Sequence, residues 1–197
     1  MIDKLRDYKI ILASQSPRRS HLLREAGIHF EISPKVEIEE SYPFGLTPEE
    51  ITIYLAELKS NVYSEYLNDS QVILITADTI VWQDNQVIGK PESYQDAWNK
   101  LKKLSGDEHV VYTGVCLRTA NRKHSFSSKS VVVFDELEDE EITYYLEKYK
   151  PYDKAGAYGI QEWIGYIGIK EIQGSFYNVM GLPIHQLYVE LKRLING

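Results

Sequence analysis

Continuous apolar runs alternate with stretches of helical periodicity along the chain. Residues 8–13 and 71–82 are runs typical of strands covered on both faces, and the second run reaches the polar triplet Ala77-Asp78-Thr79. The pattern also predicts helices over 17–26, 47–66, 93–104, 138–150 and from Pro183, strands over 109–120 and 123–137, and a hairpin over 166–180 turning at Gln173-Gly174-Ser175. Parallel-type and hairpin-type connections together indicate an α/β or α+β protein around one mixed sheet.

Two of the predicted helices have clear start signals. Ser16 is a suitable N-cap for a helix with Pro17 at its first position. Thr47 and Glu50 have the spacing of a capping box, with Pro48 at the first helical position. We therefore expect both helices to begin at these residues.

Two arginines, Arg18 and Arg19, fall in the first turn of the helix that begins at Pro17. Cations are unfavourable there by about 0.3–1 kcal/mol each, because that end of a helix carries partial positive charge. A bound anion such as phosphate would offset this cost, since helix N-termini bind anions through the same N–H groups. The alternative is that both arginines point into solvent or pair with acids such as Glu25.

Composition narrows the class of protein. The chain has 197 residues, 43% hydrophobic and 26% charged, which fits a single folded domain over 1–197. A net charge of −7 argues against a nucleic-acid-binding protein, which needs a broad basic surface. Any phosphate site must then be a confined basic pocket.

Other residue types exclude several functions. The one cysteine, Cys116, cannot form an internal disulfide and is expected to be a buried, inert thiol. The five histidines show no metal-ligand spacing, so a zinc site is not expected. The apolar run near the N-terminus is too short for a signal peptide or a membrane span, so we expect a cytoplasmic protein without a membrane partner.

Two acids could serve chemistry on phosphates. Asp78 is expected just past an apolar strand, and ligands gather at the carboxyl ends of strands in open α/β sheets. A carboxylate there can hold a divalent metal or take a proton from water. The alternative for Asp78 is an acid that caps the next turn. Glu40 could complete a metal site or could be a solvated surface residue.

A second group of candidates lies in the C-terminal half of the chain and near its middle. Pro91 fixes an extended backbone at Lys90. Asp153-Lys154 opens a loop over 153–165 whose small residues would let a ligand approach the backbone, unless the loop is a purely structural turn. Gln161 offers a donor and an acceptor side by side, matching the N–H and carbonyl edge of uracil or thymine.

Together these cations, acids and the amide indicate a site for a nucleoside polyphosphate. The common phosphate-binding motifs G-x-x-x-x-G-K-[ST] and G-x-G-x-x-G do not occur in the sequence, nor do the serine elbow G-x-S-x-G or a kinase-like H-R-D.

Four stretches resemble the Maf family of nucleoside triphosphate pyrophosphatases, in the family's order and over nearly the whole chain. They are "LASQSPRRSHLLREAG", "ITADTIVW…VIGKP", "LKKLSGDEHVVYTGV" and "DKAGAYGIQ…GSFYNVMGLP". The resemblance implies an α/β fold like that of inosine triphosphate pyrophosphatases, with a central mixed sheet flanked by helices and two lobes with a cleft between them. It also implies a divalent metal, Mg²⁺ or Mn²⁺, a homodimer, and hydrolysis of a nucleoside triphosphate to the monophosphate and pyrophosphate.

The resemblance also assigns roles to residues. The family's proton acceptor matches Asp78, which the resemblance leaves either as general base or as metal ligand, and Glu40 matches an acidic position that would share the metal. The remaining matches are Arg18, Thr79 and Gln161 for substrate choice and Arg19, Lys59, Lys90 and Ser14 for substrate binding.

Within the family, "DKAGAYGIQ" resembles the branch that acts on dTTP and UTP. Glu162 departs from the usual pattern, in which a glycine follows the glutamine. Alternatives are the branch that acts on 7-methyl-GTP, a phosphatase that releases orthophosphate, and a non-catalytic regulator of cell division.

Overall fold

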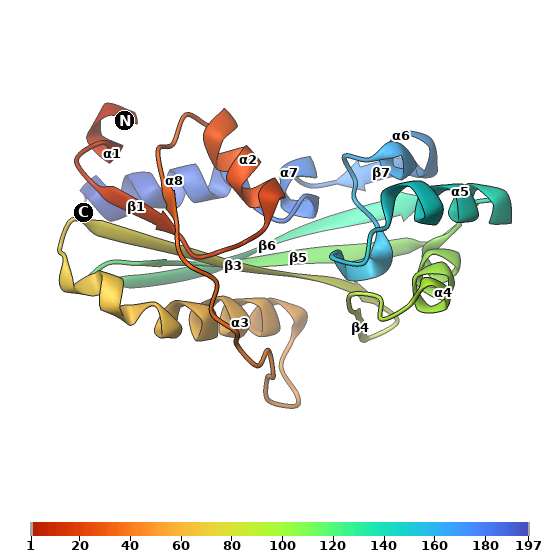
Figure 1. Ribbon diagram of the computed structural model, residues 1–197, viewed down its shortest axis with the longest axis horizontal. Coiled ribbons are helices and arrows are strands. Elements are labelled where there is room, and N and C mark those ends of the chain that lie inside the picture. The colour runs from red at the N-terminus through yellow and green to blue at the C-terminus, as the bar shows by residue number, and fades with distance from the viewer. Residues whose placement is uncertain (1, 197) are drawn as a thin grey trace. The chain divides into compact units, whose positions relative to one another are not determined.

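The strands form one mixed sheet within residues 2–196, the part of the chain described by the computed structural model (Figure 1). The strand order is β2-β1-β3-β5-β6-β7, and β4 pairs with β3, which makes seven strands. Strand β1 pairs in parallel with β2 and β3, whereas the β3–β4 and β6–β7 pairs are antiparallel. The predicted α/β class with a central mixed sheet and flanking helices is confirmed.

The bounds of the elements are as follows. The strands are β1 (Lys9–Leu12), β2 (Glu31–Ile32), β3 (Val72–Gln83), β4 (Gln86–Ile88), β5 (Glu108–Arg118), β6 (Lys123–Phe134) and β7 (Ile169–Gln173). The α-helices are α1 (Ile2–Leu5), α2 (Pro17–Glu25), α3 (Pro48–Val62), α4 (Tyr94–Leu104), α5 (Asp139–Tyr149), α6 (Trp163–Gly168), α7 (Phe176–Val179) and α8 (Ile184–Asn196). Two 3₁₀ helices, η1 (Ser64–Asn68) and η2 (Ala155–Ala157), complete the set.

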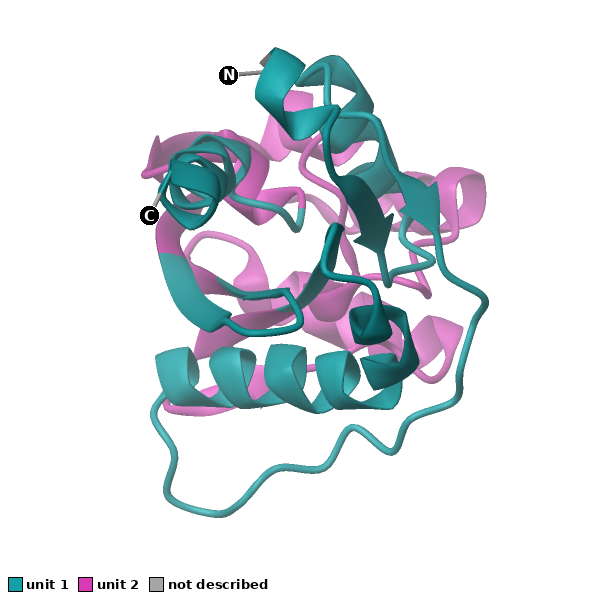
Figure 2. Cartoon of the chain, turned by 90° about the vertical axis from the view of Figure 1, so that its left-hand side faces the viewer, with its two compact units in different colours: residues 1–78, 113–128, 181–197 teal, residues 79–112, 129–180 magenta. Residues whose placement is uncertain are grey.

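The chain divides into two compact units, coloured separately in Figure 2. Unit 1 comprises residues 1–78, 113–128 and 181–197, and unit 2 comprises residues 79–112 and 129–180. Strands β3, β5 and β6 each contribute residues to both units. The single domain over 1–197 and the cleft that the family resemblance implies stay predictions.

In unit 1, helix α3 covers one face of the strands, and helices α2 and α8 cover the other (Figure 1). The helices bury aliphatic side chains against the strands: Leu22 and Leu23 from α2, Ile51 and Leu55 from α3, and Leu187 and Leu191 from α8. Cys116 of β5 is fully buried, as expected, and its Sγ lies 3.6 Å from the Ser60 hydroxyl. Burial of this apolar surface stabilises the arrangement of strands and helices that carries the candidate site.

Helix α3 packs its backbone directly against strand β5 at Gly114. A Cβ built on Gly114 would lie 2.2 Å from the Thr52 carbonyl oxygen. The Thr52 hydroxyl of α3 also lies 3.0 Å from the hydroxyl of Ser127 on the neighbouring strand β6. Glycine is therefore required at position 114 for the helix to approach the sheet this closely.

In unit 2, helix α4 packs against α5 and η2. Three aromatic rings of this unit, two of them from β5 and β6, form a compact cluster. His109 stacks on Phe134 with ring centroids 5.5 Å apart, and both rings meet Tyr158 edge-on. A hydrogen bond of 2.7 Å joins His109 Nε2 to the Tyr158 hydroxyl. Burial lowers the pKa of His109 from 6.5 to about 4, against a smaller opposing effect of Asp107.

Strand β3 matches the run predicted over 71–82 but does not end at the polar triplet, and this changes the place of Asp78. The strand continues through Asp78 to Gln83 and turns at Asp84 and Asn85 into β4. Both turn residues have positive φ angles, 50° and 59°, as a tight two-residue hairpin requires. Asp78 is therefore inside a strand, and the alternative that it caps a turn is wrong.

The hairpin predicted over 166–180 is also wrong. Ile169–Gln173 is a strand, but it pairs with β6, and the segment after Gly174 begins helix α7. Ser175 caps this helix by accepting a hydrogen bond from the Asn178 backbone N–H. The Asn178 side chain donates to Val111 O and to Ser130 Oγ, which fixes the helix against the sheet.

The loop predicted over 153–165 contains η2 and the start of α6. Gly165, in α6, allows close packing of the backbone, because a Cβ there would lie 1.8 Å from the Ile160 carbonyl oxygen. Gly156 has a φ of +70°, a conformation that favours glycine.

Candidate functional site

The turn between β1 and α2 gathers polar groups around Ser14. Its hydroxyl accepts hydrogen bonds from the Ser16 backbone N–H at 3.3 Å and from Arg19 Nη1 at 3.2 Å. Ser16 is at the N-cap position as predicted, but its own side chain makes no capping bond. The N-terminal end of α2 therefore faces a hydroxyl and a guanidinium.

Arg19 reaches away from solvent to two backbone carbonyls. Its Nε donates to Gly181 O at 2.8 Å and its Nη1 donates to Ala77 O at 2.9 Å. Glu25 instead lies 3.9 Å from His21. For Arg19, the alternative of a solvent-exposed side chain or a pair with Glu25 is wrong.

The Arg19 guanidinium is half-buried, and both burial and neighbouring charges affect its pKa. Burial lowers the pKa of its guanidinium, the Asp78 carboxylate opposes that effect, and the nearby Arg18 adds to it. A guanidinium stays protonated in proteins, so Arg19 remains a half-buried cation close to Asp78.

Asp78 lies in an ionic cluster with Lys59 and Glu40. Lys59 Nζ is 2.5 Å from Asp78 Oδ1 and 2.9 Å from Glu40 Oε1. The side chains of Asp78, Lys59 and Glu40 are 9%, 15% and 45% exposed, so the cluster runs from the interior to the surface. Two carboxylates thus share one ammonium.

Helix α3 and strand β3 of unit 1 bring Lys59 and Asp78 together. Lys59 lies in the last turn of α3, whose start is fixed by the predicted capping box of Thr47 and Glu50. Asp78 lies three residues beyond Ile75, the last β3 residue paired with β1. It is therefore next to the carboxyl end of β1, the kind of position at which ligands bind in α/β sheets.

The donor set fits a divalent metal that is shared with a substrate. Within residues 2–196 there is no group of three or more His, Cys, Asp or Glu side chains that could hold a metal alone. Glu40 and Asp78 nevertheless present oxygens to one cation, the Lys59 ammonium. Mg²⁺ is often held by one or two carboxylates together with substrate phosphates, so these two residues suit that metal.

The other expected residues lie in unit 2. Thr79 follows Asp78 in β3 and is half-buried, and Lys90 is exposed just after β4. The Gly156 N–H donates to Gly89 O at 3.3 Å, so the stretch containing Lys90 lies beside the η2 loop. Within the described part of the chain, the buried Oε1 of Gln161 has no hydrogen-bond partner. An unpaired buried acceptor is costly, and a ligand N–H would satisfy it.

An ion-paired network beside Gln161 was not predicted from the sequence. Lys154 Nζ is 3.1 Å from Glu162 Oε1 and 2.8 Å from Asp153 Oδ1, and Lys154 is only 8% exposed. The Tyr145 hydroxyl donates to Glu162 Oε2 and accepts from the Gly159 N–H. Lys154 was noted only as part of a loop, and Tyr145 carries no local signal because its partners are 14 and 17 residues away.

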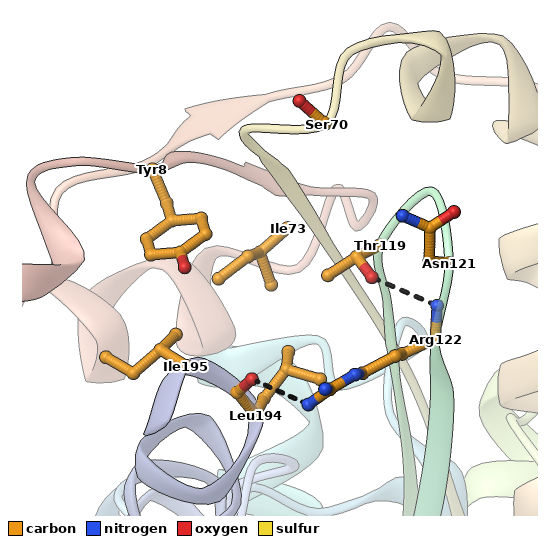
Figure 3. Close-up of a pocket in the computed structure, with 8 residues that line it drawn as sticks. All are labelled: Tyr8, Ser70, Ile73, Thr119, Asn121, Arg122, Leu194 and Ile195. Atoms are coloured by element: carbon orange, nitrogen blue, oxygen red, sulfur yellow. Dashed lines mark hydrogen bonds between the residues drawn. The ribbon is translucent and has the colours of Figure 1, made fainter. Parts of the chain in front are cut away.

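A separate pocket of about 240 Å³ lies elsewhere in unit 1 (Figure 3). It is lined by Tyr8, Ser70, Ile73, Thr119, Asn121, Arg122, Leu194 and Ile195, which include none of the expected site residues. Arg122 points to the Leu194 carbonyl oxygen, at 3.4 Å, so its charge is directed to the protein's own backbone. This pocket lacks the convergent cations that a triphosphate requires.

The fold and the ionic cluster define an α/β protein that surrounds a buried carboxylate with basic side chains. The chain belongs to the Maf family: the family of Maf-like proteins matches residues 9–194. In residues 2–196, none of the helices has both the length and the apolar character to cross a bilayer.

Curated relatives are similar over almost their whole length. The dTTP/UTP pyrophosphatase of Porphyromonas gingivalis (strain ATCC 33277) is 53% identical over 98% of this chain and 97% of the relative. Those of Phocaeicola vulgatus and Bacteroides thetaiotaomicron are 54% and 52% identical, each covering 98% of this chain and 100% of the relative. The solved Staphylococcus aureus Ham1 protein covers 93% of this chain and 99% of its own at 15% identity, with a TM-score of 0.47, a likeness too small to establish a shared fold.

Proposed function

We propose that this protein hydrolyses dTTP and UTP to the nucleoside monophosphate and pyrophosphate. The observation that carries the proposal is the buried carboxylate of Asp78 in β3. It forms an ion pair with Lys59 and lies close to Arg19, next to the carboxyl end of β1. The names of the relatives, which are about half identical over nearly the full chain, support the pyrimidine substrates.

In this proposal the basic side chains hold the triphosphate. Arg18 lies at the N-terminal end of α2, where backbone N–H groups already favour an anion. Arg19 is anchored through Ala77 and Gly181 and supplies a fixed positive charge. The Lys59 ammonium would replace its contact with one of the two carboxylates by a contact with a phosphate oxygen. Lys90 would neutralise charge on the leaving pyrophosphate.

The reaction is an in-line displacement at the α-phosphorus. A water oxygen forms the new bond to phosphorus while the bond to the bridging oxygen breaks, and pyrophosphate leaves with the electron pair of that bond. Asp78 takes the proton of the attacking water, a role worth typically about 10²–10⁴-fold in rate. A divalent metal held through Glu40 and Asp78 would supply additional neutralisation of phosphate charge.

Base selection is assigned to Gln161 and Thr79. Gln161 Oε1 is buried without a partner in the described chain, and it would accept a hydrogen bond from the ring N–H of thymine or uracil. The corresponding ring nitrogens of cytosine and adenine carry no proton, so binding either base would leave the acceptor unsatisfied and cost affinity.

A nucleotide panel tests the proposal. Products from dTTP, UTP, CTP, GTP, 7-methyl-GTP and ATP are to be measured with Mg²⁺, with Mn²⁺ and without metal. We expect pyrophosphate from dTTP and UTP only in the presence of metal. Preference for 7-methyl-GTP, release of orthophosphate, or no turnover of any nucleotide would each contradict the proposal.

The family resemblance also leads us to propose a homodimer that acts in the cytoplasm on a free nucleotide, without nucleic-acid or membrane partners. Light scattering on the purified protein measures its mass directly, and we expect twice the chain mass of 22.8 kDa. A monomeric mass would contradict the dimer without affecting the proposed reaction.

A further inference from the structure

Gln161 lies in a tight turn whose two ends are both held by side chains. The Glu162 N–H donates to the Gly159 carbonyl oxygen at 2.9 Å, which makes residues 159–162 a turn with Gln161 at its third position. Ile160, the second turn residue, is 4% exposed and anchors the turn in the interior. The direction of the Gln161 side chain therefore depends on how the turn is fixed.

The Tyr145 hydroxyl fixes the start of the turn. It accepts a hydrogen bond from the Gly159 N–H at 3.0 Å and donates to Glu162 Oε2. Burial, followed by the interaction with Glu162, raises the pKa of Tyr145, so this hydroxyl keeps its proton and both bonds persist over the working pH range. One phenol from α5 thus joins the first and last residues of the turn.

Glu162 fixes the end of the turn. Its Oε1 is 3.1 Å from Lys154 Nζ, and the two side chains are 18% and 10% exposed. Loss of Lys154 would leave the Glu162 carboxylate without its counter-ion, whereas Lys154 also pairs with Asp153 at 2.8 Å. A Cβ on Gly159 would lie 2.8 Å from Glu162 Cδ and 3.0 Å from Lys154 Cε, so the carboxylate and the ammonium chain pack directly on the turn backbone.

We propose that Glu162 is a positioning residue for base selection, which acts by holding the turn that presents Gln161. This inference rests on the proposed function. The glycine that the family pattern has at this position could not make the contacts to Lys154 and Tyr145. In this chain a charged side chain therefore takes part in setting the orientation of the base-selecting amide.

The test is a double-mutant cycle on substrate preference. The measured quantity is the ratio of kcat/KM for dTTP to kcat/KM for CTP. Glu162→Gln keeps the size of the side chain and an acceptor for Tyr145 but removes the ion pair with Lys154. We expect it to lower the ratio by about tenfold, the equivalent of one weakened hydrogen bond. In a Gln161→Ala background the same change is expected to lower the ratio less than about twofold, because the effect passes through Gln161.

Two further variants separate positioning from general damage. Tyr145→Phe removes the hydroxyl that joins Gly159 to Glu162 while it keeps the ring, and it is expected to lower the ratio in the same Gln161-dependent way. If Glu162→Gln does not fold, Tyr145→Phe decides the question. Glu171→Gln, on the exposed part of β7, is the matched control and is expected to leave the ratio unchanged.

The outcomes distinguish this inference from the proposed function. An unmodified protein that does not prefer dTTP to CTP contradicts the proposed function. An unmodified protein with that preference, together with Glu162→Gln and Tyr145→Phe variants that keep it, contradicts only the role of Glu162. An equal loss in the presence and absence of Gln161 also contradicts it, because it would show a structural effect that does not act through the amide.

Discussion

At the scale of single residues, the contact of Lys59 with two carboxylates has a consequence for metal binding. Its ammonium lies 2.5 Å from Asp78 Oδ1 and 2.9 Å from Glu40 Oε1, so it already satisfies the oxygens that suit a divalent cation. A metal ion must compete with the Lys59 ammonium for these two carboxylates until the ammonium binds a phosphate of the nucleotide instead. Metal and nucleotide should therefore favour each other's binding.

Replacement of Lys59 tests this competition. We expect Lys59→Met to bind Mn²⁺ at least about tenfold more tightly than the unmodified protein when no nucleotide is present, because two carboxylates lose their counter-ion. The free Mn²⁺ signal in electron paramagnetic resonance measures the affinity. Lys123→Met, which removes an ion pair with Glu57, is the control. Unchanged Mn²⁺ affinity in Lys59→Met would show that the ammonium does not compete.

Asp78→Asn tests the chemical step. It keeps the size of the side chain but removes the proton acceptor, so kcat for dTTP should fall by about 10²–10⁴-fold. Thermal unfolding should show a folded variant, since an amide can still accept a hydrogen bond from Lys59. Asp3→Asn, at an exposed ion pair with Arg6, should retain full activity. Full activity in Asp78→Asn would remove Asp78 from the reaction.

The sequence predicted some of these residues better than others, for a physical reason. Asp78 interrupts an apolar run, and Arg19 occupies a helix end that disfavours cations, so each is locally anomalous. Lys59 is an ordinary helical lysine, and only the family resemblance singled it out. Tyr145 and Glu162 are 17 residues apart in the sequence and form their hydrogen bond only in the folded chain, so no local pattern could have predicted this contact.

At the scale of elements, the position of helix α3 depends on Gly114. The helix carries Lys59 in its last turn, and its backbone touches β5 at the site of the missing side chain. A methyl group there would push the helix away from the sheet and displace the ammonium from its two carboxylates.

Gly114→Ala is therefore expected to destabilise the protein by about 1–3 kcal/mol, the usual cost of overpacking, and to lower activity as well. Urea unfolding measures the free-energy change. Gly89→Ala is the control for stability, because a Cβ at Gly89 meets no atom within 4 Å. Equal stability of the two variants would contradict the close approach of α3.

Helices were easier to predict than the segments between them. The capping box of Thr47 and Glu50 is confirmed, because it depends only on residues three apart. The hairpin over 166–180 was wrong because the partner of β7 is β6, more than thirty residues earlier in the chain. Long-range pairing of this kind leaves no periodic signal in the sequence.

At the scale of the whole molecule, stability should depend on pH through His109. Burial lowers the pKa of this imidazole from 6.5 to about 4, so the folded protein keeps it neutral. The unfolded chain binds the proton first as the pH falls. The stabilisation is complete above about pH 6.5 and is lost progressively toward pH 4, by roughly 3 kcal/mol in total.

Urea unfolding at a series of pH values between 4 and 8 measures this loss. His109→Asn should reduce the pH dependence over that range, whatever its effect on stability at pH 8. His29→Asn replaces an exposed histidine and should leave the pH dependence unchanged. If the free energy of unfolding of His109→Asn depends on pH as strongly as that of the unmodified protein, groups other than His109 cause the pH dependence.

The division of the chain into interleaved units bears on the order of events during synthesis. The backbone passes from one unit to the other four times, after residues 78, 112, 128 and 180. All residues of unit 2 are synthesised before α8, whereas unit 1 needs α8 to cover its strands. The layer of helices over the unit 1 strands that carry Asp78 can therefore be completed only after the whole of unit 2 has been synthesised.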